Sequence, residues 1–96
     1  MRVNGRYRDR RTERFARGDF VAAFSSFERT ARRRLTSVET ARSLEALAVI
    51  PGHRFEALRG NRAGQFSVRI NDQWRICFEW SGTEAQAVSI EIVDYH

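Results

Sequence analysis

The sequence predicts an α+β fold, in which two N-terminal helices pack on one face of a small twisted antiparallel sheet. Apolar residues recur at helical spacing in the first half of the chain, and they alternate with polar residues in the second half. A chain of 96 residues can bury one modest core. We therefore expect a single domain that spans residues 1–96.

The first half of the chain is expected to be mainly helical. Residues 1–7 should form a short edge strand, and residues 8–17 a helix that turns Phe15 inward and ends at Gly18. A longer helix of about 20 residues should follow, because apolar residues recur at steps of three and four. Its apolar face would consist of Phe20, Phe24, Phe27, Ala31, Leu35, Val38 and Ala41. Residues 44–50 add a helical turn before a Pro-Gly break.

The second half is expected to form the sheet. Strands are predicted at residues 53–58, 65–70, 74–80 and 87–93. In the last strand, Val88, Ile90 and Ile92 should share one face, because strand side chains alternate between the two faces. The apolar face of the sheet would meet the helices, and the opposite face would stay open.

The two middle strands read "SVRINDQWRICFEW" and predict a hairpin. A three-residue loop at 71–73 keeps both apolar sets on one face, with Val68 opposite Ile76. On the open face this register sets Arg69 opposite Arg75, although like charges usually destabilise such a pair. Our hypothesis is that an RNA phosphate, or an acidic group before RNA arrives, lies between the two guanidinium groups. The alternative is neutralisation by a nearby carboxylate, from Glu56, Glu91 or Asp94.

The charge of the chain is uneven. The net charge is +5, and all 17 basic residues are arginine. Residues 1–34 hold eleven arginines against four acids, whereas the remainder holds six against eight. A proteome-wide preference for arginine would explain the missing lysines but not this asymmetry. The basic surface favours a polyanionic partner, either nucleic acid or an acidic protein. Arg33, in a run of three arginines, is expected first as a solvated residue and second as an RNA contact.

Several classes of protein are disfavoured by composition. No apolar run approaches the length of a membrane span, so no membrane association is expected. Cys77 is the single cysteine, which excludes an internal disulfide and favours the reducing cytoplasm. We expect Cys77 to be a small strand residue. His53, in a Pro-Gly loop, is expected to be exposed rather than catalytic.

The candidates for chemistry lie in two segments. The chain ends in "VDYH", and an ordered terminus would place Asp94, Tyr95 and His96 at the rim of the open face, near Arg75; the alternative is an inert surface tripeptide. The segment "RFEALRGNRAGQ" supplies a second set, namely Glu56, Arg59 and Arg62. The sequence has no Gly-rich phosphate loop and no cluster of ligands suited to a metal. We therefore expect a reaction without metal or cofactor, and this inventory suits cleavage of RNA through its 2′-hydroxyl.

The stretch "LEALAVIPGHRFEALRGNRAGQFSVRINDQWRICFEW", with the terminal "VDYH", resembles the HigB branch of the RelE-type toxins. The likeness extends more loosely to "YRDRRTERFARG". It implies a RelE-like fold and a ribosome-dependent endonuclease that cleaves messenger RNA. It also implies a cognate helix-turn-helix antitoxin (HigA-like) as partner, and an active site on the open face of the sheet.

The resemblance also suggests roles for individual residues. The family's hairpin arginine falls on Arg75, and its basic residue before the glycine turn on Arg59; both would stabilise the phosphate. Asp94, Tyr95 and His96 match the terminal motif, with His96 transferring the proton, Tyr95 stacking on the substrate and Asp94 orienting His96. Some members carry histidine where this chain has Glu56, so His96 and Glu56 both remain candidates for the base. Arg69 is not part of the shared motif, and its contact with RNA is expected from strand parity alone; Arg62 and Arg33 are expected as further RNA contacts.

Two other functions use the same features. The chain could be a non-catalytic module that binds RNA or DNA, with the terminal motif incidental. It could also be a subunit that docks an acidic protein on its arginine-rich surface.

Overall fold

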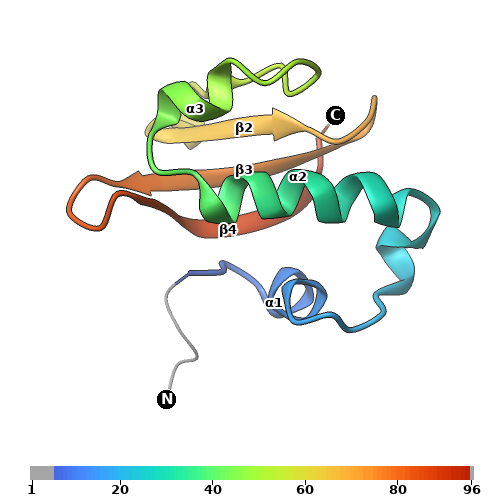
Figure 1. Cartoon of the computed structure of the whole chain (residues 1–96). Coiled ribbons are helices and arrows are strands. Elements are labelled where there is room, and N and C mark those ends of the chain that lie inside the picture. The colour runs from blue at the N-terminus through green and yellow to red at the C-terminus, as the bar shows by residue number, and fades with distance from the viewer. Residues whose placement is uncertain (1–5, 96) are drawn as a thin grey trace.

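The computed structural model describes residues 6–95, and these residues form helices and one antiparallel sheet (Figure 1). The elements are α1 (Arg10–Ala16), the 3-10 helix η1 (Ala22–Phe27), α2 (Glu28–Thr40), α3 (Leu44–Ala48), β1 (Glu56–Ala57), the 3-10 helix η2 (Gly60–Arg62), β2 (Gln65–Arg69), β3 (Trp74–Ser81) and β4 (Gln86–Asp94). The strand order is β1-β2-β3-β4. The predicted α+β fold is confirmed. Within the described residues, no helix is long and apolar enough to cross a membrane.

The hairpin of β2 and β3 has the predicted register. Val68 pairs with Ile76, and Arg69 pairs with Arg75. The Asn71 side chain holds the loop, because its Oδ1 accepts hydrogen bonds from the backbone N–H groups of Gln73 and Trp74, each at 2.8 Å. A polar residue at the start of the loop thus closes the turn and sets both strand faces.

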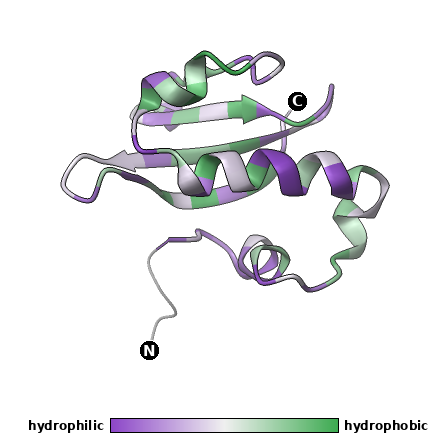
Figure 2. Ribbon diagram, viewed as in Figure 1, coloured by the Kyte–Doolittle hydropathy of each residue, from purple (hydrophilic) through white to green (hydrophobic). Residues whose placement is uncertain are grey.

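The core lies between the helices and one face of the sheet, and α2 crosses that face (Figures 1 and 2). Phe24 is central, since its ring lies 5.1 Å from that of Phe15 and 5.6 Å from that of Trp74, measured between centroids. The strands contribute Val68, Ile76, Phe78, Ala87, Ile90 and Ile92, and Ile70 follows directly after β2. We call the opposite face, which carries Ser67, Arg75, Cys77 and Glu91, the open face.

The prediction of one long helix from residue 20 onward is wrong for the first third of that segment. That part is the 3-10 helix η1, and α2 begins only at Glu28. With three residues per turn, Val21, Phe24 and Phe27 face the core at equal spacing. Val21 is therefore buried, whereas Phe20 is 64% exposed instead of lying in the core as predicted.

The side chains of β4 do not follow the simple alternation that the sequence predicted. The register shifts between Cys77 and Glu79 of β3, and Ser89 on β4 has a positive φ of 52°. This is a β-bulge, which inserts one residue and reverses the alternation. Ile90 and Ile92 stay buried as predicted, but Val88 is only half-buried. Ala87 takes its place in the core.

The outer edge of β4 is covered by the N-terminal segment. Ile90 exchanges two backbone hydrogen bonds of 2.8 Å with this segment, donating to Arg6 and accepting from Arg8. Further along, the Ile92 N–H donates to Thr12 Oγ1 at 3.0 Å. Of the predicted edge strand, residues 1–5 lie outside the described residues, and Tyr7 forms a parallel bridge with Ile90.

The opposite edge of the sheet is shorter than predicted. Residues 53–58 were expected as a strand, but β1 comprises only Glu56–Ala57. The preceding residues turn inward instead, so that His53 is 1% exposed. The prediction that His53 lies on the surface is wrong, because the Pro-Gly turn packs it against α3 rather than projecting it into solvent.

Thr12→Val tests the contact between α1 and β4. Valine preserves the buried volume but leaves the Ile92 N–H without an acceptor, which costs about 1–3 kcal/mol. We expect the free energy of unfolding in urea to fall by that amount. The matched control is Thr36→Val on the exposed side of α2, where a change within about 0.5 kcal/mol is expected. Equal effects of the two substitutions would contradict a structural role for the Thr12 hydroxyl.

Candidate functional site

Arg75 is the residue around which the open face is organised. Its Nε donates to Ser67 Oγ at 2.8 Å, and its Nη2 donates to the Arg54 carbonyl oxygen at 2.7 Å. Glu56 Oε1 lies 3.6 Å from the same Nη2. The side chain is only 12% exposed. Because Glu56 and Ser67 are themselves cross-strand partners, the guanidinium is held by β1, by β2 and by Arg54, two residues before β1.

Arg54, whose carbonyl accepts one of these hydrogen bonds, has an unusual backbone conformation. Arg54 has a φ of 45°, in the left-handed region that non-glycine residues rarely adopt. Such a residue costs about 1–3 kcal/mol and persists only where its surroundings enforce it. Here the conformation coincides with the carbonyl that accepts from Arg75.

The chain terminus reaches the same part of the molecule. The Tyr95 N–H donates to the Gln73 carbonyl at 2.7 Å, and the Arg75 guanidinium carbon lies 5.6 Å from the centre of the Tyr95 ring. Asp94 accepts a 2.9 Å hydrogen bond from Gln73 Nε2. His96 lies outside the described residues. The structure thus brings Tyr95 to Arg75 and ties Asp94 to the hairpin loop.

A second group of charges lies on the open face beside Cys77. Arg62 Nη1 donates to Glu91 Oε2 at 3.1 Å, and this hydrogen bond raises the pKa of Arg62. Arg8 Nε lies 3.5 Å from the same Glu91 oxygen, and Arg8 Nη2 lies 3.5 Å from Glu79. The sequence did not indicate Arg8, because its position becomes clear only once residues 6–8 are paired with β4.

Cys77 lies below these charged side chains. It is fully buried, as expected for a small strand residue. Burial raises the pKa of its thiol to about 11, and the nearby guanidinium of Arg62 opposes this shift. The thiol is therefore protonated at neutral pH and is a poor nucleophile.

The paired arginines are each neutralised by an acid. Arg69 forms an ion pair with Asp72 in the hairpin loop, and Arg75 pairs with Glu56. Of the three acids that the sequence suggested, Glu56 is thus confirmed as a partner, whereas Glu91 pairs with Arg8 and Arg62 instead. Neighbouring like charges on β2 and β3 are tolerated because each arginine has its own carboxylate.

Two further predicted residues lie on other elements than Arg75. Arg59 is exposed at the start of η2, on the connection between β1 and β2. Arg33 is exposed on α2, which packs on the face of the sheet opposite to Arg75 (Figure 1). The structure therefore does not bring Arg33 to the open face.

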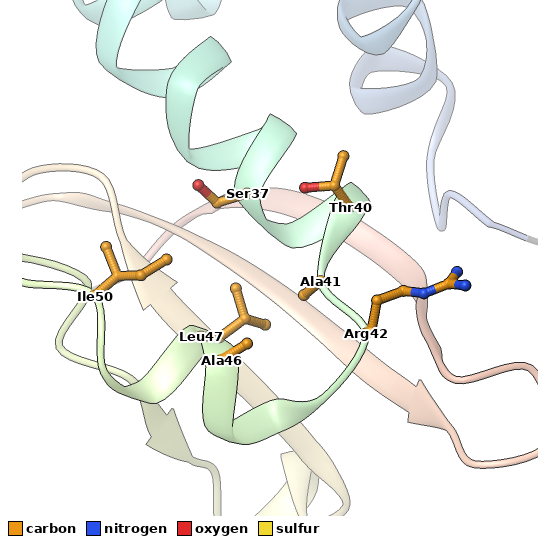
Figure 3. A pocket seen from close by; sticks show the side chains of 7 residues that line it. All are labelled: Ser37, Thr40, Ala41, Arg42, Ala46, Leu47 and Ile50. Atoms are coloured by element: carbon orange, nitrogen blue, oxygen red, sulfur yellow. The ribbon is translucent and has the colours of Figure 1, made fainter.

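The described surface also has an apolar hollow of about 350 Å³ between the end of α2 and α3 (Figure 3). It is lined by Ser37, Thr40, Ala41, Arg42, Ala46, Leu47 and Ile50. This hollow is on the helical side of the molecule and contains none of the candidate residues. Within residues 6–95, no group of three or more His, Cys, Asp or Glu side chains could hold a metal ion.

Two comparisons with known proteins give matches to this chain. Residues 5–96 match the family model described as "RelE-like toxin of type II toxin-antitoxin system HigB". The curated Toxin HigB-1 of Vibrio cholerae serotype O1 is 41% identical over 56 residues, which are 58% of this chain and 59% of that toxin. The match thus spans less than two thirds of the length of the relative.

The burial of Cys77 predicts a slow reaction with iodoacetamide. With a pKa of about 11, about one thiol in a thousand is ionised at pH 8, against roughly a quarter for a free cysteine. We expect alkylation of the native protein, followed by mass spectrometry, to be at least about 100-fold slower than in denaturant. Equal rates in the two conditions would show that the thiol is accessible in the native state.

Proposed function

The chain belongs to the RelE-like HigB toxins of type II toxin–antitoxin systems, and we propose that it is a ribosome-dependent endoribonuclease that cleaves messenger RNA without a metal ion. The observation that carries this proposal is the placement of Arg75. Its guanidinium is held on the open face, beside a carboxylate and a tyrosine ring. Cleavage of RNA through its 2′-hydroxyl requires a cation that stabilises the phosphate and a group that accepts a proton. The tyrosine ring adds a surface on which a base can stack.

The proposed reaction is an in-line displacement at phosphorus. A base takes the proton of the ribose 2′-hydroxyl, and the 2′-oxygen forms a bond to phosphorus. The bond from phosphorus to the 5′-oxygen breaks, and an acid donates a proton to that leaving oxygen. The products are a 2′,3′-cyclic phosphate and a 5′-hydroxyl, and neither oxidant nor cofactor is consumed.

Arg75 would stabilise the negative charge that develops on the phosphoryl oxygens. The hydrogen bonds that it makes to Ser67 and Arg54 use Nε and Nη2. Nη1 is then the nitrogen best placed to reach a phosphate oxygen. Because the guanidinium is already oriented, little reorganisation is needed when charge develops in the transition state.

Two residues remain candidates for the base. Glu56 has a carboxylate already beside the guanidinium that would hold the phosphate, and its side chain is 55% exposed. His96 carries an imidazole, the side chain that most often transfers protons in general acid–base catalysis. If Glu56 is the base, the phosphate must share Arg75 with it; if His96 is the base, Glu56 orients Arg75.

The other residues would bind rather than react. Tyr95 would stack on a base next to the cleaved linkage, and Asp94 would orient His96. Arg59, exposed at η2, would add a second cation for the phosphate. We propose that Arg69 and Arg62 contact the RNA by exchanging their carboxylate partners for phosphates. Arg33 would contact ribosomal RNA from the helical side.

The partners follow from the family. We propose a cognate helix-turn-helix antitoxin that neutralises this chain, and the ribosome with its messenger RNA as the target. The site would act in the cytoplasm, where translating ribosomes are found. The arginine-rich helices would make ribosome binding weaken steeply with salt, because each neutralised phosphate releases counterions.

Arg75→Ala tests the enzyme directly. Losing a preorganised electrostatic contact to the transition state lowers kcat by about 100- to 1000-fold. We expect that loss in a translation assay that measures cleaved messenger RNA. Arg42→Ala, which removes an exposed arginine beside the α2–α3 hollow, is the matched control and should retain cleavage. If the wild-type protein binds ribosomes but leaves the message intact, the chain is a binding module instead of an enzyme.

The choice of base is tested by the dependence of cleavage on pH. Loss of the base should reduce the rate by about 100- to 10,000-fold and remove the limb that reports its pKa. If His96 is the base, His96→Gln removes this limb and Glu56→Gln keeps it. If Glu56 is the base, Glu56→Gln removes the limb and His96→Gln keeps it.

A further inference from the structure

His53 is a buried titratable residue that the proposed mechanism does not use. Its side chain comes from the turn between α3 and β1, and the residue is 1% exposed. Its Nδ1 lies 3.1 Å from the Leu47 carbonyl oxygen near the end of α3. Its Nε2 is buried and has no hydrogen-bond partner among the described residues. We propose that His53 is a positioning residue for Arg75, acting through the backbone of Arg54, and that protonation of its imidazole releases Arg75.

The turn that carries His53 is held from three sides. The His53 N–H donates to Ile50 at 3.2 Å, and the His53 carbonyl accepts from Arg69 N–H of β2 at 2.7 Å. Gly52, with a φ of 86°, lies directly against the Arg34 guanidinium of α2, since a Cβ at that position would be 2.9 Å from Nη2. The imidazole supplies the side-chain contact that ties this turn to α3.

The next residue transmits that position to the open face. Arg54 follows His53 directly and has the left-handed φ of 45°. Its carbonyl is the acceptor for Arg75 Nη2 at 2.7 Å. A non-glycine residue returns to an ordinary φ when its surroundings loosen. Release of the turn would therefore rotate the Arg54 peptide and remove an acceptor from Arg75.

Protonation is the event that would loosen the turn. The charged group whose electrostatic repulsion disfavours a protonated imidazole is Arg34 of α2. Arg34 is in turn repelled by Arg33 of α2 and by Arg69 of β2. Arg69 itself forms an ion pair with Asp72. From α3, the contact is the neutral Leu47 carbonyl. An imidazolium here would be buried and would face a guanidinium.

The sign of the pH effect follows from these surroundings. Burial lowers the pKa of His53, the Leu47 carbonyl opposes this shift, and Arg34 adds to it. The folded protein therefore holds the neutral form to a lower pH than the unfolded chain, whose histidine titrates near 6.5. Stability and the position of Arg75 are intact above about pH 6.5 and are lost as the pH falls toward the lowered value.

The first test observes Arg75 without relying on catalysis. The ¹H–¹⁵N signal of Arg75 Nε, identified by its absence in Arg75→Lys, is followed from pH 7.5 to pH 5. Only two histidines are present, so His96→Gln serves as the background that removes the other imidazole. We expect the signal to move with a midpoint below the ordinary pKa of histidine. A second substitution, His53→Asn, keeps a donor for the Leu47 carbonyl and should abolish the titration.

The second test concerns the reaction and rests on the proposed function. At pH 7.5 His53→Phe fills the same space without a donor, and we expect kcat for messenger RNA cleavage to fall about 10- to 100-fold with an unchanged KM for ribosomes. His53→Asn should stay within about twofold of wild type, because it restores the hydrogen bond. If His53→Phe does not fold, His53→Asn is still compared with the wild type, and a loss of rate beyond about twofold in His53→Asn would contradict the positioning role.

The outcomes separate this inference from the proposed function. A titration of Arg75 Nε that persists in His53→Asn, or a His53→Phe variant with the wild-type signal and rate, would overturn the positioning role. A wild-type protein that leaves messenger RNA intact would remove the nuclease. In that case the arginine signal still decides whether His53 positions Arg75.

Discussion

The hydrogen bonding of one guanidinium, that of Arg75, joins three segments of the chain on the open face of the sheet. Arg75 projects from β3, but its position is set by acceptors from its surroundings, namely Ser67 Oγ on β2 and the Arg54 carbonyl before β1. Glu56 adds a carboxylate from β1. An arginine held this way loses little side-chain entropy when it binds a ligand, because its rotamers are already restricted. In the proposed function, the guanidinium would therefore be oriented before the phosphate binds.

Each of four arginines on the open face has a carboxylate partner. Arg69 has Asp72, Arg75 has Glu56, and Glu91 serves both Arg8 and Arg62. Asp72 and Glu56 are exposed, so water competes for them, whereas Arg75 and Glu91 are mostly buried. In the proposed function, phosphates would displace these carboxylates from the arginines.

The two faces of the sheet differ in role: one packs against the helices, and the other carries the charged side chains. Aromatic contacts, such as those of Phe24, cover the apolar face of the sheet. Phe24 belongs to the 3-10 helix η1, which the sequence did not distinguish from α2. The open face obtains its shape from the bulge at Ser89, which reverses the alternation of β4 and sets Glu91 opposite Cys77. A bulge and a 3-10 turn depend on tertiary packing, and for that reason periodicity alone misses both.

The sequence by itself determined the fold class, the register of the central hairpin and the pairing of Arg69 with Arg75, because these depend on the two-residue period and on a local Asn turn. It also indicated Glu56 and Tyr95, which the fold brings to Arg75. The tertiary structure alone decided that His53 is buried, that Arg54 supplies an acceptor and that Arg8 reaches Glu91. Those contacts join segments far apart in the chain, and their distances follow from how helices, edge segments and strands pack rather than from any local pattern.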